Sequence, residues 1–214
     1  MSFLATLAAG GPVMIPLLAC SFAAVAVIIE RAFFLRSAAR PGDRLLAEVQ
    51  HDLAAGDTAA AAERCEKAHS SVGRVLAAGI RAGWSGNSAD KTMSERAMCE
   101  LLALNRGLPL LDTVVTVAPL LGLLGTVTGM IRSFGVLAKT GTNHPTGITA
   151  GVAEALIATA TGLVIAIVSL VAHNYLQSRV KGVAADIELR ATQLEHFLER
   201  TATAQRAASV AGEC

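Results

Sequence analysis

The stretch "TGITAGVAEALIATATGLVIAIVSLVA" (residues 146–172) decides the fold, because it can cross a lipid bilayer as one helix. A hydrocarbon core of about 30 Å needs roughly 20 predominantly apolar helical residues. Only one side chain in this stretch, Glu154, is charged. A charge at membrane depth is costly, and such residues commonly mark ion or proton pathways. The rest of the sequence must therefore show whether this segment lies in a membrane and what the carboxylate does there.

Two other stretches and the overall composition also favour a membrane protein. Residues 1–29 contain no charged side chain, and residues 107–131 contain only Asp112. Of the 214 residues, 16% are charged and 53% are hydrophobic, and the mean hydropathy is +0.52. Soluble domains carry about 25% charged residues. We therefore expect an all-α integral membrane protein with three transmembrane helices.

The distribution of Lys and Arg predicts the orientation of these helices. Residues 30–106 hold 11 of them, the tail after His173 holds five, and residues 132–148, which connect the apolar parts of the second and third spans, hold only Arg132 and Lys139. Cytoplasmic flanks collect Lys and Arg, so we expect the N-terminus and that connection to lie outside. The expected order is a transmembrane helix at 1–35, a cytoplasmic helical region at 36–106, a transmembrane helix at 107–138, a short periplasmic loop at 139–148, a transmembrane helix at 149–174, and a cytoplasmic C-terminal helix and tail at 175–214.

The tail carries apolar side chains spaced by three and four positions, which predicts one long amphipathic helix that continues the third span. These side chains are Leu176, Val180, Val183, Ile187, Leu194 and Leu198. The stripe that they form indicates one of two arrangements: the helix packs on a partner helix, or it lies on the chain's own cytoplasmic region.

Small residues in the second and third spans predict close helix packing. They are Gly122, Gly125 and Gly129 in the second span, and Gly151, Ala155, Ala158 and Gly162 in the third. Small residues four positions apart remove side-chain bulk from one face of a helix, so that another helix can approach closely. This packing can join helices of one chain or helices of neighbouring copies.

Polar side chains inside these spans are the candidate functional residues: Thr126 in the second span, and Glu154, Thr159 and Thr161 in the third. A buried threonine hydroxyl often bonds to its own helix backbone, which is the alternative for each threonine. Glu154 either lies on an ion or proton path or, when protonated, makes one structural hydrogen bond between helices. Because one carboxylate per chain makes a poor relay, we expect a second carboxylate from a partner or from further copies of the chain.

The sequence gives little support to other classes of function. A net charge of +1 and 4% aromatic residues make no case for nucleic-acid binding. The four cysteines and five histidines are scattered, so we expect unpaired thiols, no metal and no cofactor. The motif "GWSG" (83–86) superficially matches an intramembrane serine protease, but it lies in a polar linker outside any span. Because no catalytic motif stands at membrane depth, we do not expect an enzyme.

Two motifs carry a family resemblance: "APLLGLLGTVTGMIRSF" (118–134) and "GITAGVAEALIATATGLVIAI" (147–167). In this order, with a short outside loop between them, they resemble the MotA/TolQ/ExbB proton channel family in its ExbB/TolQ branch. The resemblance implies that Thr126, Glu154 and Thr159 are polar pore residues. Thr161 does not occupy a matched position and ranks below them.

The resemblance also implies an assembly and a function. Members form pentamers in the bacterial inner membrane, within lipid, around a pore lined by the second and third spans. Inside the pore lie two copies of a single-span partner of the ExbD/TolR type, whose intramembrane aspartate takes up and releases protons. The implied function is a proton-channel subunit that couples the proton motive force, through a TonB/TolA-like periplasm-spanning protein, to TonB-dependent transport or to the Tol system. The sequence fits both ExbB and TolQ. The alternatives are a non-conducting membrane scaffold and a MotA-like stator subunit.

Overall fold

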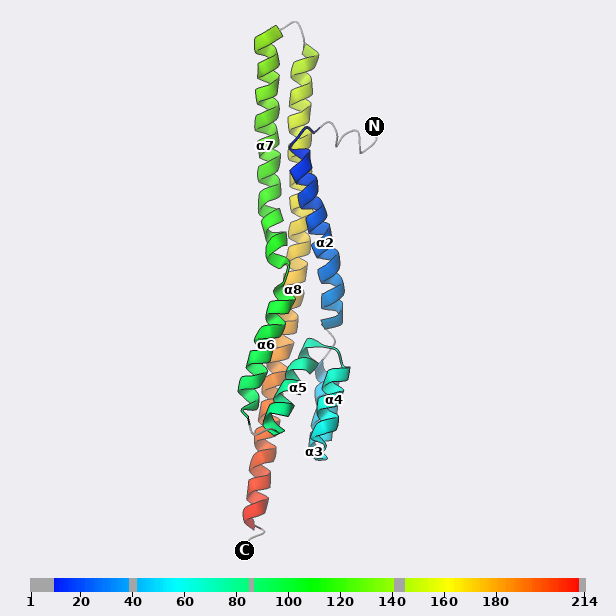
Figure 1. Cartoon of the computed structure of the whole chain (residues 1–214), viewed down its shortest axis with the longest axis vertical. Helices are drawn as coiled ribbons and strands as arrows, with labels where there is room; N and C mark the ends of the chain where they lie inside the picture. Colours follow the sequence, from blue (N-terminus) through cyan, green and yellow to red (C-terminus); the bar gives the residue numbers. More distant parts are fainter. Residues whose placement is uncertain (1–9, 39–41, 85–86, 141–144, 212–214) are drawn as a thin grey trace. The chain divides into compact units, whose positions relative to one another are not determined.

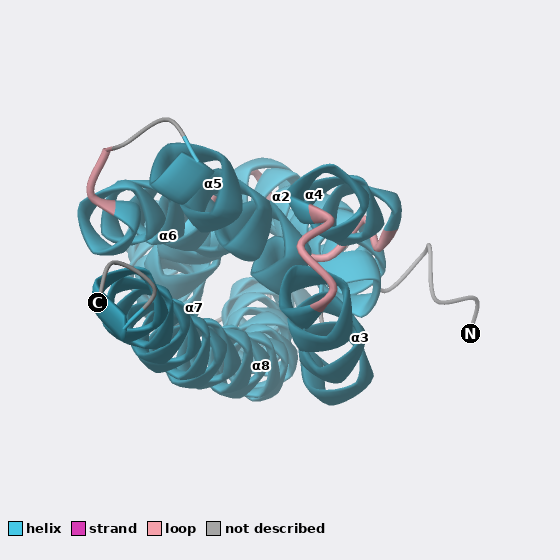
Figure 2. Cartoon of the chain, turned by 90° about the horizontal axis from the view of Figure 1, so that it is seen from below, coloured by secondary structure: helices cyan, strands magenta, loops and turns pink. Residues whose placement is uncertain are grey.

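A computed structural model of the chain describes residues 10–38, 42–84, 87–140 and 145–211. Its helices are α2 (Met14–Ala38), α3 (Gly42–Ala54), α4 (Thr58–Lys67), α5 (Ser71–Trp84), α6 (Ala89–Asn105), α7 (Leu108–Thr140) and α8 (Pro145–Ala211) (Figure 1). The described residues contain no strand (Figure 2), which confirms the all-α fold. Parts of the "GWSG" motif and of the expected periplasmic loop lie outside the described residues, at 85–86 and 141–144.

The chain divides into two compact units. Unit 1 comprises Met1–Arg31 and Gly107–Leu176, and unit 2 comprises Ala32–Arg106 and Gln177–Cys214. Unit 1 therefore contains most of α2, all of α7 and the first part of α8. Unit 2 contains α3 to α6 together with the ends of α2 and α8.

In the described part of the chain, three helical stretches are long and apolar enough to cross a membrane, and their apolar parts lie in α2, α7 and α8. This confirms the expectation of three spans. Large apolar side chains on these helices are exposed: Ile15 and Phe22 on α2, Leu123 and Ile131 on α7, and Leu156 and Val171 on α8. Such faces suit contact with lipid or with helices of other chains.

Unit 2 is built around large buried apolar side chains. They include Leu46 and Val49 of α3, Val75 and Leu76 of α5, Met93 and Leu104 of α6, and Val180, Ile187 and Leu194 of α8. The α8 residues belong to the stripe along the tail, so this stripe packs on the chain's own helical region. Of the two arrangements open for the stripe, packing on a separate partner helix is therefore wrong for these residues. The continuation of the third span into one long helix is confirmed, because α8 runs unbroken to Ala211.

The short helices of unit 2 are separated by turn residues that the sequence provides. Gly56 has a φ of +82°, a left-handed conformation that glycine adopts without strain. The side chain of Asp57 then accepts a hydrogen bond of 2.8 Å from the backbone nitrogen of Ala60, which caps α4. Consecutive helices from α3 to α6 consequently fold back and pack on one another (Figure 2).

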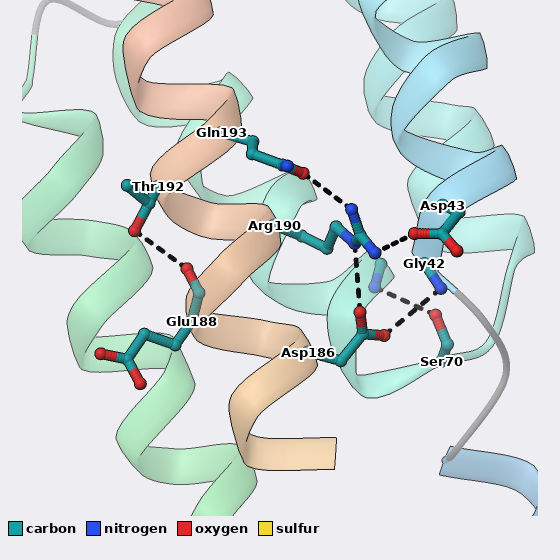
Figure 3. A network of polar contacts seen from close by, with 9 residues as sticks. Gly42, Asp43, Ser70, Asp186, Glu188, Arg190, Thr192 and Gln193 are labelled. Atoms are coloured by element: carbon teal, nitrogen blue, oxygen red, sulfur yellow. Dashed lines mark hydrogen bonds and ion pairs between the residues drawn. The ribbon is translucent and has the colours of Figure 1, made fainter. Parts of the chain in front are cut away.

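A polar network fixes the start of α3 against α8 (Figure 3). The carboxylate of Asp186 accepts a hydrogen bond of 3.3 Å from the backbone nitrogen of Gly42, the first residue of α3. Arg190 donates to Asp186 at 3.1 Å and to Gln193 at 2.8 Å, and it also forms an ion pair with Asp43. A carboxylate at a helix N-terminus is stabilised by the helix dipole, so Asp186 serves both α3 and Arg190.

Candidate functional site

Helices α7 and α8 contact each other through small residues. This small-residue contact comprises Ala118, Gly122, Gly125, Gly129 and Ser133 on α7, and Gly151, Ala155, Ala158 and Gly162 on α8. A Cβ atom on Gly125 would lie 2.4 Å from the Cβ of Ala158, and one on Gly162 would lie 2.5 Å from the carbonyl oxygen of Ala118. Real Cβ atoms do not approach so closely, so the separation of the two backbones requires glycine at these positions. The structure therefore places the four candidate packing glycines between two helices of one chain.

Glu154 on α8 forms an ion pair with Arg132 on α7. The Nη1 atom of Arg132 lies 2.7 Å from Oε2 and 2.9 Å from Oε1 of the carboxylate. The Glu154 side chain is 15% exposed, whereas that of Arg132 is 54% exposed. A mostly buried carboxylate is costly without a partner, and the guanidinium offsets part of that cost.

The segment that leads into α2 also contacts Glu154. Gly11 has a φ of +72°, and a Cβ atom on it would lie 1.7 Å from Oε1 of Glu154. A larger residue would be strained at this φ and would push the Glu154 carboxylate out of its present position. The carboxylate is thus enclosed by three parts of unit 1: the segment at Gly11, α7 and α8.

From the sequence alone, Arg132 is only a charge that follows the apolar part of the second span, and Gly11 has no predicted role. The signal for Arg132 was its position, because it is the first charged residue after the apolar part of that span. Helix α7 continues past it to Thr140, so its side chain projects from a helix and can reach the neighbouring helix.

The candidate threonines differ in their hydrogen bonds. Thr159 donates across to the carbonyl oxygen of Gly122 on α7 at 3.0 Å, and its hydroxyl also lies 3.2 Å from the carbonyl oxygen of Ala155. Thr126 and Thr161 donate to carbonyl oxygens of their own helices, at 2.6 Å and 2.8 Å. In the described part of the chain, none of these hydroxyls bonds to the Glu154 carboxylate. The structure therefore links Thr159 to the helix contact, and it gives Thr126 and Thr161 local bonds.

The part of the chain that the structure describes shows no group of three or more His, Cys, Asp or Glu side chains suited to a metal ion. Within it, Cys20, Cys65 and Cys99 are free thiols. Burial raises the pKa of the Cys65 thiol to about 12, and the charge of Glu66 adds to this shift. A thiol that stays protonated is a poor metal ligand and a poor nucleophile, which fits Cys65 as a core residue.

The sequence matches the description of one family, the MotA/TolQ/ExbB proton channel family, over residues 67–189. This chain belongs to that family. The matched residues include all of α5, α6 and α7 and residues 145–189 of α8. They therefore contain Thr126, Arg132, Glu154 and Thr159, and the resemblance carried by the two motifs is confirmed.

Proteins with ExbB and TolQ names are similar to this chain in sequence. A biopolymer transport protein of Synechocystis sp., named ExbB-like 3, is 36% identical over 195 residues, which cover 90% of this chain and 93% of that protein. ExbB-like 1 of the same organism is 35% identical over 193 residues, which cover 88% of this chain and 72% of that protein. The Tol-Pal system protein TolQ of Haemophilus influenzae is 42% identical over 89 residues, which cover 41% of this chain and 38% of that protein. These similarities, together with the three helices that are long and apolar enough to cross a membrane, indicate a multi-pass membrane protein.

Proposed function

We propose that this chain is the proton-channel subunit of a motor in the bacterial inner membrane. In this role it couples the proton motive force to TonB-dependent transport or to the Tol system. One observation carries the proposal: Glu154 lies largely buried on a helix able to cross a membrane, and its ion-pair partner, Arg132, comes from the adjacent helix. Charged groups at membrane depth that pair with one another are typical of ion and proton pathways. Family membership supports the same role.

The proposed channel is an assembly of several copies, with a pentamer as the expected size. Exposed apolar faces on α7 and α8, which carry Leu123 and Leu156 among others, support further helices packing there. A single-span partner of the ExbD/TolR type would lie in the pore and supply the aspartate that carries the proton. A TonB/TolA-like protein would then transmit the work across the periplasm.

Within this assembly, Thr126, Glu154 and Thr159 line the proton path, and Thr161 has a lesser part. The Glu154 carboxylate helps to hold water in the path and sets the polarity of the path beside the partner's aspartate. Arg132 acts as a positioning residue, because it holds the Glu154 carboxylate through two contacts in the single chain. An incoming partner carboxylate can compete with Glu154 for the same guanidinium. Lysine keeps the positive charge that attracts either carboxylate, whereas glutamine does not. Proton flux should therefore be higher in Arg132→Lys than in Arg132→Gln.

The proposal is tested by proton flux into vesicles that contain the chain together with its partner. Glu154→Gln keeps a hydrogen-bonding side chain but cannot ionise, so flux should fall about ten-fold or more if a carboxylate is required on the path. Glu199→Gln is the matched control, because Glu199 is an exposed glutamate on the same helix. Flux that is unchanged in Glu154→Gln would favour the alternative, a non-conducting scaffold.

Complementation separates the pathways that the motor could serve. Strains lacking ExbB, TolQ or the MotA stator would each receive this chain together with its partner, and recovery of one phenotype would identify the system. The proposed role is transport rather than catalysis. Hydrolytic activity of the purified chain that disappears in Ser85→Ala would contradict it.

A further inference from the structure

An open cavity of about 500 Å³ in unit 2 gathers three arginines. Arg74 and Arg81 come from α5, and Arg96 comes from α6. The residues at 74, 77, 78 and 81 recur every three or four positions, so they share one face of α5. His69, between α4 and α5, and Glu66 of α4 complete the lining. The cavity therefore presents more cationic than anionic groups to solvent.

One buried carboxylate is shared by two of these arginines. Glu100 is 6% exposed, and its oxygens lie 2.5 Å and 2.7 Å from the guanidinium of Arg74 and 2.9 Å from that of Arg96. Burial by itself would raise the pKa of Glu100, but hydrogen bonding and charge from Arg74, with help from Ser71 and Arg96, hold it below its ordinary value. Glu100 is therefore ionised at neutral pH. One negative charge then faces two positive charges, which leaves a net positive charge beside the cavity.

The third arginine has a partner that an anion can replace. Arg81 lies 2.6 Å from Glu66, and both side chains are about half exposed, at 60% and 48%. Exposed ion pairs contribute little free energy, because water screens both charges. A ligand with a higher charge density can therefore take the place of the Glu66 carboxylate at little cost.

We propose that this cavity binds a small phosphate-bearing anion. Guanidinium groups are planar forks that match phosphate oxygens and form charge-assisted hydrogen bonds with them. The cavity also has the volume of a typical small-ligand site, which ranges over about 300–1,000 Å³. The residues that line this cavity are not those proposed to line the proton path, and Arg74, Arg81 and Arg96 all belong to unit 2. Either a soluble phosphorylated molecule or a lipid headgroup supplies the required phosphate chemistry.

The first experiment titrates pyrophosphate into the full chain held in nanodiscs of zwitterionic lipid, at constant ionic strength. We expect saturable binding with one site per chain, and a melting temperature that rises with pyrophosphate concentration because the ligand binds the folded state. Arg81→Gln and Arg96→Gln should each weaken binding about ten-fold through the loss of a charge-assisted contact. Arg81→Lys should recover only part of that loss, because a lysine lacks the fork.

Arg64→Gln is the matched control. Arg64 is an exposed arginine on the neighbouring helix α4, paired with Asp52 and Glu48, and it does not line the cavity. Its replacement should leave pyrophosphate binding unchanged. Binding that is absent at millimolar pyrophosphate, or equal in the Arg81→Gln, Arg96→Gln and Arg64→Gln variants, would overturn the proposal.

A second arm separates the two sources of phosphate. Nanodiscs with phosphatidylglycerol replace the zwitterionic ones, and the pyrophosphate titration is repeated. If an anionic headgroup occupies the cavity, apparent pyrophosphate affinity falls in the unsubstituted chain and falls less in Arg81→Gln. If affinity is the same in both lipids, the ligand is a soluble phosphorylated molecule.

Discussion

Units 1 and 2 each hold a carboxylate against arginine, but they surround it differently. In unit 1, Glu154 meets the single, half-exposed Arg132 beside a contact made of glycine and alanine. In unit 2, Glu100 is almost fully buried, it binds both Arg74 and Arg96, and the neighbouring core is made of large apolar side chains.

The difference follows from what surrounds each unit in the proposed membrane arrangement. In water, burial of large apolar side chains stabilises a helical region through the hydrophobic effect. Between helices in lipid this gain is small, because lipid tails are as apolar as leucine, and close backbone approach with interhelical polar contacts takes its place. Unit 1 should therefore be most sensitive to added volume at its glycines, and unit 2 to changes at its buried side chains, which include Glu100.

The largest effect is expected for Gly125→Leu. Its Cβ alone would lie 2.4 Å from the Cβ of Ala158, so α7 and α8 would have to separate. We expect the free energy of unfolding to fall by about 3 kcal/mol or more, at the upper end for overpacked sites. Melting of the detergent-solubilised chain, followed by circular dichroism, measures this change. Gly135→Leu is the control, because a Cβ on Gly135, on the same helix, meets no atom within 4 Å. Equal melting of the two variants would show that the small-residue contact does not hold the helices together.

A smaller effect, with a defined pH dependence, is expected for Glu100→Gln in unit 2. The substitution should destabilise unit 2 by about 1.5–3 kcal/mol at neutral pH, because hydrogen bonds to a charged group are lost. The pKa of Glu100 is lower in the folded chain than in the unfolded chain. The advantage of the unsubstituted chain is therefore fully present above the pKa that Glu100 has in the unfolded chain, and it is lost as pH falls through the lower folded value.

The fluorescence of Trp84, the single tryptophan, measures this change, because Trp84 ends α5 in unit 2. Denaturant unfolding of both chains would be followed between neutral pH and pH values below the unfolded pKa of Glu100. A difference between the chains that stays constant over this range would show that ionisation of Glu100 does not stabilise the unit. Glu95→Gln, an exposed glutamate of α6, serves as the control.

The sequence was informative wherever a property depends on pattern along the chain. Length and polarity predicted the three spans, and the spacing of Leu176 to Leu198 predicted that the third span continues as a helix. The sequence did not predict contacts that depend on how two helices are rotated against each other. The pairing of Arg132 with Glu154 joins residues 22 positions apart on two helices, and no spacing rule fixes their relative rotation. Likewise, the tail stripe identified a buried face without identifying what covers it.

The smallest effect is expected from a comparison of two threonines in unit 1. Thr159→Val removes a hydrogen bond that crosses to the carbonyl oxygen of Gly122, whereas Thr126→Val removes a bond within its own helix. Interhelical hydrogen bonds in membrane proteins contribute on average about 0.6 kcal/mol, so Thr159→Val should lower the free energy of unfolding by roughly that amount and Thr126→Val by less. Unfolding in mixed micelles with increasing sodium dodecyl sulfate measures both changes.

Proton flux measured on the same variants separates packing from conduction. If Thr126 lines the proposed path, Thr126→Val reduces flux while leaving stability nearly intact, and unchanged flux would remove Thr126 from the path. Equal destabilisation by the two substitutions would show that the hydroxyl of Thr159 does not join α8 to α7.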